Sequence, residues 1–218
     1  MADYESRRTE EGFRRLIAFS DAVVAIALTL LVLPLADIPR EISEDTTVGD
    51  VLSEHMPEIV SFFVSFIVIW VLWRNHHRTM EHFRTYDRVL FELHFVWLLT
   101  IVALPFVTAM LDNQYIERAN AVYMGVLAVS ILSLVSMTAW GARRRELLEP
   151  GDDIEPWLRR RSGTVTFVLL VVAMVIAILY PETGSWPLLL LVLSGAVEKL
   201  LARLRDRTAG RARGPRAR

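Results

Sequence analysis

The chain has 218 residues, of which 53% are hydrophobic, and its formal net charge is -1. The apolar residues form blocks separated by charged blocks, whereas a soluble domain spaces them along amphipathic elements, so the pattern predicts a polytopic membrane protein and argues against one soluble core. Cysteine is absent, which excludes disulfides, thiolate metal sites and cysteine nucleophiles.

The first apolar block spans residues 13–35 and follows a polar segment, residues 1–12, that we expect on the cytoplasmic side. As a helix the block would rise about 35 Å, which is enough to cross a hydrocarbon core. We expect Pro34 to end this helix, because proline lacks an amide hydrogen and crowds the preceding turn.

Five further apolar blocks follow, separated by short polar connections. Pro105 lies inside the third block and is expected to kink it. The last segment, residues 205–218, is rich in arginine and glycine without apolar periodicity, so we expect a disordered basic cytoplasmic tail. The sequence thus predicts an all-α channel domain over residues 13–204 with six transmembrane helices, at about 13–35, 58–73, 89–111, 119–141, 163–180 and 186–204.

The basic residues predict the orientation. All of them except Arg40 and Arg118 fall in the head, the second and fourth connections and the tail, or in the ends of the spans next to the head and the tail. By the positive-inside rule both termini are therefore cytoplasmic, in a multi-pass protein of the cell membrane. We expect the arginine clusters to contact anionic lipid headgroups, and we expect no nucleic-acid binding, because the tail lacks aromatic stacking partners.

A hydroxyl and a carboxylate, Ser20 and Asp21, lie about two turns inside the start of the first block. A carboxylate there costs about 3 kcal/mol on insertion scales, so it marks a candidate site. Arg15 is roughly 240° away around the helix and cannot easily pair with Asp21, which must find its partner on another helix. The best candidates are Trp73 and His76, three residues apart at the cytoplasmic end of the second span. Alternatively, His76 is an ordinary interfacial residue in a basic loop.

Aliphatic side chains follow on the same helix. Ile26, Leu30 and Leu33 share one face, with Thr29 beside them. Around an axis formed by several copies they would make stacked apolar rings, which can gate conduction by dewetting. On spacing alone, a face turned towards lipid or a neighbouring helix is equally compatible with the pattern.

The sequence contains no motif typical of a metal site or of a metalloenzyme. His77 and Glu81 stand at a ligand-like spacing, but no H-E-x-x-H motif occurs, so we expect no metal, no cofactor and no enzymatic activity. The acids of the first connection, residues 36–57, can attract cations towards an external mouth or simply confer solubility.

Three short motifs carry a family resemblance. They are Arg15-x-x-x-Phe19-Ser20-Asp21, Trp73-x-x-His76 and Leu104-Pro105-Phe106. Together they resemble the transmembrane protein 175 family, potassium channels of bacteria and of lysosomes. The resemblance implies that the first helix lines the pore, with a hydrophobic constriction at Ile26 and a selectivity-associated hydroxyl at Thr29, in place of a T-V-G-Y-G filter.

The resemblance also implies an assembly and a function. One six-span unit per chain implies a homotetramer around a central pore, conducting potassium selectively or preferentially. We expect the polar set to clamp the pore helix without touching the ion; it comprises Arg15, Phe19, Ser20, Asp21, Trp73 and His76. The alternatives are a proton-coupled secondary transporter or small-solute exporter that uses Asp21, and a non-transporting scaffold.

Overall fold

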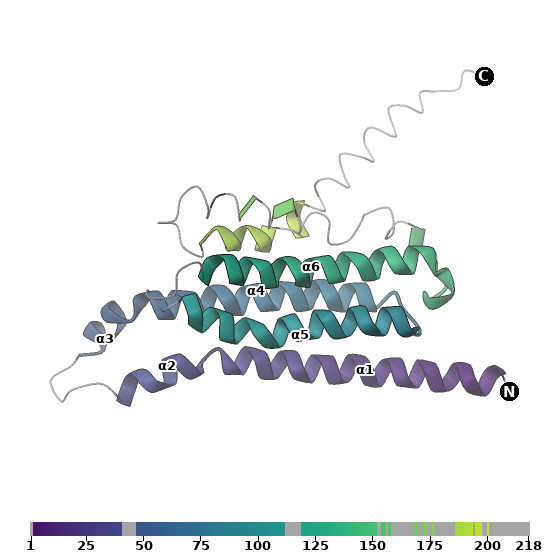
Figure 1. Ribbon diagram of the computed structural model, residues 1–218, viewed down its shortest axis with the longest axis horizontal. Helices are drawn as coiled ribbons and strands as arrows, with labels where there is room; N and C mark the ends of the chain where they lie inside the picture. Colours follow the sequence, from purple (N-terminus) through teal and green to yellow (C-terminus); the bar gives the residue numbers. More distant parts are fainter. Residues whose placement is uncertain are drawn as a thin grey trace, which may run out of the picture.

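A computed structural model describes residues 2–40, 47–111 and 119–151, together with short stretches between 154 and 200. In these residues four helices are long and apolar enough to cross a membrane. The first of these spans is Glu10–Asp37, which takes in most of α1 (Ala2–Leu30) and the short helix that follows it. The others are α4 (Met56–Met80), α5 (Arg88–Leu111) and α6 (Ala119–Arg143), and the four long helices lie side by side along one direction (Figure 1). Shorter elements are α2 (Leu33–Asp37), η1 (Ile38–Arg40), α3 (Val48–Glu54), η2 (Arg145–Leu147) and η4 (Trp186–Leu193).

The first span differs from its prediction at both ends. The helix starts at Ala2, well before residue 13, and α1 ends at Leu30. A turn at residues 31 and 32 separates it from α2, which carries Pro34 in its first turn. Pro34 has no amide hydrogen for the carbonyl of Leu30, so the interruption falls one turn before the proline instead of after it.

The second span is longer than predicted, because α4 continues from Met56 to Met80. His76 is therefore a residue of the helix, and not of a loop. The third and fourth spans lie within two residues of their predicted bounds, and α5 runs through Pro105 as one helix. Most of the predicted fifth and sixth spans, 163–180 and 186–204, and the tail lie outside the described residues, although Trp186–Leu193 forms a 3-10 helix against α4.

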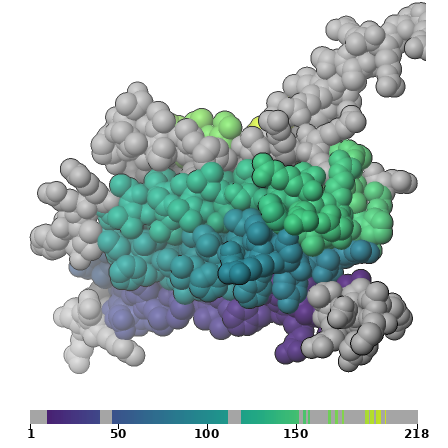
Figure 2. Space-filling view, turned by 45° about the vertical axis from the view of Figure 1, so that its right-hand side comes forward, coloured from purple at the N-terminus to yellow at the C-terminus, as the bar shows by residue number. Residues whose placement is uncertain are grey.

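The core of the bundle is formed by α4, α5 and α6 together. Helix α1 packs along one side of α4 and α5 (Figure 2). The fully buried side chains on α5 include Trp97, Ile101 and Leu104. Ser65 of α4 lies 3.2 Å from the hydroxyl of Tyr123 on α6 and 2.9 Å from that of Thr108 on α5. Such hydroxyl contacts connect helices where lipid offers no hydrogen-bond partner.

A second anchor joins α6 to the start of α5. Asp87 accepts a hydrogen bond from the amide of Leu90, which caps α5, and its other oxygen lies 2.9 Å from the indole nitrogen of Trp140. Nearby, the backbone of Arg84 donates to the carbonyl of Leu147. The α4–α5 loop is thereby fixed to the segment that follows α6.

The connection between the first two spans contains the helix α3. Thr47 caps it, accepting from the amide of Asp50, while the Asp50 carboxylate accepts from the hydroxyl and the amide of Thr47. This capping box satisfies two amide groups that a helix start otherwise leaves free. The hydrogen bonds from Thr47 lower the pKa of Asp50 below its ordinary value.

Candidate functional site

The polar residues of α1 face α4 and α5. Asp21 accepts a hydrogen bond of 2.8 Å from the indole nitrogen of Trp73, so the carboxylate inside the span has a donor on a neighbouring helix. Ser20 is 1% exposed and donates to the carbonyl of Leu16 in its own helix, at 2.9 Å. Because consecutive helical residues point about 100° apart, Ser20 and Asp21 reach different partners.

The partner of Ser20 is His94 on α5. The Ser20 hydroxyl oxygen lies 2.5 Å from Nε2 of His94, and Nδ1 of His94 lies 3.2 Å from Nε2 of His76. Since the Ser20 hydroxyl donates to Leu16, one donor order uses each group once: His76 donates to His94, and His94 donates to Ser20. The two histidines thus link α1, α5 and α4 through a buried polar chain.

An aromatic ring completes this buried cluster. The His76 ring stacks on Trp97, with centroids 3.8 Å apart and planes at 10°, and both side chains are almost fully buried. On the other side of Asp21, Trp73 stacks on His77 at 5.3 Å. Stacking fixes the orientation of the donor and acceptor atoms, so the hydrogen bonds need little further ordering. We call the set Ser20, Asp21, Trp73, His76, His94 and Trp97 the polar network.

The structure does not bring all the predicted clamp residues together. Asp21 contacts Trp73, but His76 meets Asp21 only through His94 and Ser20. Phe19 is 59% exposed and points away from the network, and Arg15 is exposed. In the described part of the chain no hydrogen bond joins Arg15 to the network.

The sequence interpretation missed His94 and Trp97. One signal could have found His94, because it is the last ionisable residue of α5 and lies within the apolar part of the helix, and an ionisable residue in a span indicates a buried partner. Its partners lie 18 and 74 positions earlier in the chain, and such distances carry no periodic pattern.

The predicted pore residues lie on the opposite side of α1. Ile26 is 58% exposed, Leu30 40% and Leu33 55%, whereas Val24 and Ala27 are each 2% exposed against the bundle. The Thr29 hydroxyl donates to the carbonyl of Ile26 at 2.7 Å and is exposed. Leu30 ends α1 and Leu33 begins α2, while Val32 between them keeps a helical backbone conformation.

In the stretches that the structure describes, no group of three or more histidine or acidic side chains is arranged to hold a metal ion. His77 and Glu81 form a pair, with 3.4 Å between nitrogen and oxygen. The candidate site is therefore an arrangement of hydrogen bonds between helices.

Fold and site define an all-α, multi-pass membrane protein whose first helix is held by a buried polar network and has an exposed apolar side. Residues 15–105 match the family described as the endosomal/lysosomal potassium channel TMEM175. The chain is 32% identical over 146 residues to a potassium channel of Streptomyces collinus, covering 65% of this chain and 68% of that one. The chain belongs to the TMEM175 family, a family of channels and not of enzymes.

Two further relatives and one structure support the assignment. A potassium channel of Chamaesiphon minutus is 36% identical to this chain, over 54% of this chain and 61% of its own length. The human endosomal/lysosomal proton channel TMEM175 is 26% identical, over 72% of this chain and 32% of its own length. The crystal structure of a lysosomal potassium-selective channel TMEM175 homolog from Chamaesiphon minutus superposes with a TM-score of 0.65 at 24% identity. That match covers 88% of this chain and 98% of the other, and it establishes the shared fold.

Proposed function

We propose that this chain forms a potassium-permeable channel of the cell membrane, with α1 of each subunit lining the path. The observation that carries the proposal is the division of α1 into two sides. One side packs on α4 and α5 through Val24 and Ala27, and the other leaves Ile26, Leu30 and Leu33 exposed. We propose potassium as the permeating ion because two bacterial relatives are named potassium channels.

The proposed constriction consists of the exposed aliphatic side chains. In a ring of symmetry-related helices, Ile26 and Leu30 would form adjacent apolar collars, which exclude water until the helices move apart. Leu33, after the break in the helix, would form a further collar at the outer end. Thr29 would place hydroxyls beside the Ile26 collar, where we propose that selectivity arises.

The polar network has a supporting role in this proposal. Its hydrogen bonds fix the rotation of α1 about its own axis, because Ser20 and Asp21 must meet His94 and Trp73. Fixing that rotation also fixes which residues face the axis. Arg15 and Phe19, which are exposed here, would then contact a neighbouring subunit or lipid headgroups.

The proposed assembly is a homotetramer with both termini in the cytoplasm. One α1 per chain cannot enclose a path, so several copies are required, and the family resemblance favours four. The arginine-rich cytoplasmic segments would contact anionic lipid headgroups, in agreement with the distribution of basic residues.

The decisive experiment is potassium flux through purified protein in liposomes. A channel passes potassium down its gradient with unitary current steps, whereas a carrier shows slow flux that saturates and a scaffold shows none. Crosslinking or mass measurement of the same sample gives the subunit count. Absence of potassium flux from correctly assembled protein would contradict the proposal.

A second candidate function is proton movement, as a permeating ion or through coupled transport. Asp21 favours it, because its carboxylate lies inside a span, and the vertebrate relatives are named proton channels. A pH-sensitive dye in the same liposomes separates the candidates. Proton flux without potassium flux, abolished by Asp21→Asn in assembled protein, would favour this second function.

A further inference from the structure

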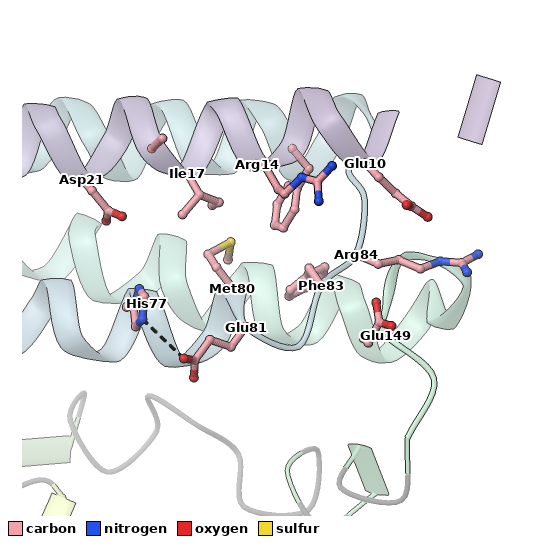
Figure 3. Close-up of a pocket in the computed structure, with 12 residues that line it drawn as sticks. Glu10, Arg14, Ile17, Asp21, His77, Met80, Glu81, Phe83, Arg84 and Glu149 are labelled. Atoms are coloured by element: carbon pink, nitrogen blue, oxygen red, sulfur yellow. Dashed lines mark ion pairs between the residues drawn. The ribbon is translucent and has the colours of Figure 1, made fainter. Parts of the chain in front are cut away.

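An open pocket of about 470 Å³ lies behind α1, at the end of the bundle that carries the start of this helix (Figure 3). Its volume is within the range of small-molecule sites in proteins. It is lined by one side of α1, the last turns of α4 and the two segments that follow α4 and α6. The residues that define its chemistry are Glu10, Phe13, Arg14, Ile17, Asp21, His77, Met80, Glu81, Phe83, Arg84 and Glu149.

The charges are distributed unevenly along this pocket (Figure 3). Asp21 and the His77–Glu81 pair lie at its inner end, which contains no lysine or arginine. The outer half holds the carboxylates of Glu10 and Glu149 together with the guanidinium groups of Arg14 and Arg84. The outer half is therefore balanced in charge, whereas the inner end is negative.

The inner end also has unused hydrogen-bonding capacity. Only Oδ1 of Asp21 accepts from Trp73, and no donor in the described chain bonds to Oδ2. Nδ1 of His77 is buried and has no partner among the described residues. A ligand carrying several N–H donors would satisfy groups that the protein itself does not.

The walls between the two ends are apolar. Phe13, Met80 and Phe83 belong to the buried core, with 6%, 3% and 4% exposure, and Ile17 packs beside them. We propose that this pocket binds a small organic cation with an apolar body. Its protonated amine lies against Asp21 and Glu81, and its aromatic or aliphatic part lies between Phe13 and Met80.

Such a ligand would bind outside the conduction path. Ile26 lies five residues after Asp21, about 140° around the helix, so the pocket and the proposed pore are on different sides of α1. Binding would affect the rotation of α1 about its axis, because Asp21, which contacts the ligand, also accepts the hydrogen bond from Trp73. The site does not rest on the proposed channel function, since binding can be measured without any flux.

The test is calorimetric titration of the purified protein at pH 7 with benzylammonium, and with benzyl alcohol as the neutral control of the same shape. We expect saturable binding of one benzylammonium per chain, and benzyl alcohol at least tenfold weaker. Glu81→Gln should weaken the amine about fivefold, whereas Glu92→Gln, which removes an exposed acid of α5 outside the pocket, should not. Equal affinities for amine and alcohol would overturn the proposal.

Two further variants locate the site. Ala18→Phe adds a ring to the pocket wall and should abolish binding while leaving the polar network intact. Ile26→Asn changes the opposite side of α1 and should leave the affinity unchanged. Binding that survives Ala18→Phe, or that is lost in Ile26→Asn, would place the ligand elsewhere and refute the assignment.

Discussion

The indole nitrogen of Trp73 and the carboxylate of Asp21 are joined by a hydrogen bond of 2.8 Å between residues 52 positions apart. The bond connects α1 to α4 within the predicted membrane span, and both side chains are partly buried. Removing one partner of such a bond leaves the other unsatisfied, and this cost exceeds the net gain of forming the bond. The pair therefore determines how α1 lies on the bundle.

Trp73→Phe should lower the stability of the assembled protein. The change removes the donor to Asp21 but keeps most of the aromatic contact, and a hydrogen bond to a charged group is worth about 2 kcal/mol. We expect the midpoint of thermal unfolding in detergent to fall by roughly 5 °C. The control is Trp70→Phe one turn earlier, a side chain that is 47% exposed. Equal effects of the two substitutions would show that the Asp21 contact contributes nothing.

Ser20→Ala should also destabilise the protein, through His94. The variant leaves Nε2 of His94 buried without its partner, at a cost of about 1–3 kcal/mol. Ser133→Ala is the matched control, because the Ser133 hydroxyl bonds only to the carbonyl of Val129 in its own helix. The midpoint of thermal unfolding of each variant is compared with that of the unaltered protein. If Ser20→Ala lowers the midpoint no more than Ser133→Ala does, the hydrogen bond between Ser20 and His94 does not contribute to stability.

Ile26→Asn should raise the cation current. An amide in place of the apolar collar would hold water at the proposed constriction and lower the barrier to ion entry. Leu99→Asn introduces the same group on α5, at a side chain that is 57% exposed and that we expect to face lipid, and it should not raise the current. Single-channel conductance and the potassium-to-sodium permeability ratio measure the effect. If Ile26→Asn leaves both quantities unchanged, the constriction lies elsewhere.

Replacing either of two glycines of α6 with alanine should have different effects on the stability of the protein. A Cβ at Gly141 would come within 2.7 Å of the Phe83 ring and 3.1 Å of Leu148, so Gly141→Ala should cost about 1–3 kcal/mol by overpacking. Among the described residues, a Cβ at Gly125 would meet no side chain and no other helix within 4 Å, so Gly125→Ala should be neutral or slightly stabilising. The midpoint of thermal unfolding measures both effects. If Gly141→Ala does not lower the midpoint, the loop that contains Phe83 can move to make room for the added methyl group.

The family motifs contain four of the six residues of the polar network. The sequence shows these residues as polar side chains within or beside apolar blocks: Ser20, Asp21, Trp73 and His76. A polar side chain in a membrane span needs a hydrogen-bond partner, which marks them as candidates. Their pairing was not recognisable, because it depends on the rotation of each helix about its axis. His94 stands between Ser20 and His76, and a contact between residues 74 positions apart leaves no local pattern.

The sequence alone determined the all-α class and the approximate position of the four described spans, because each span is a long apolar block between charged segments and charged groups are costly inside a membrane. It did not determine which side of each span meets protein and which meets lipid, since both environments accept the same aliphatic side chains. Only the packing of α1 against α4 and α5 decided that Val24 is buried while Ile26 is exposed. The same packing created the pocket behind Asp21, because its walls come from segments that meet only when the helices close on one another.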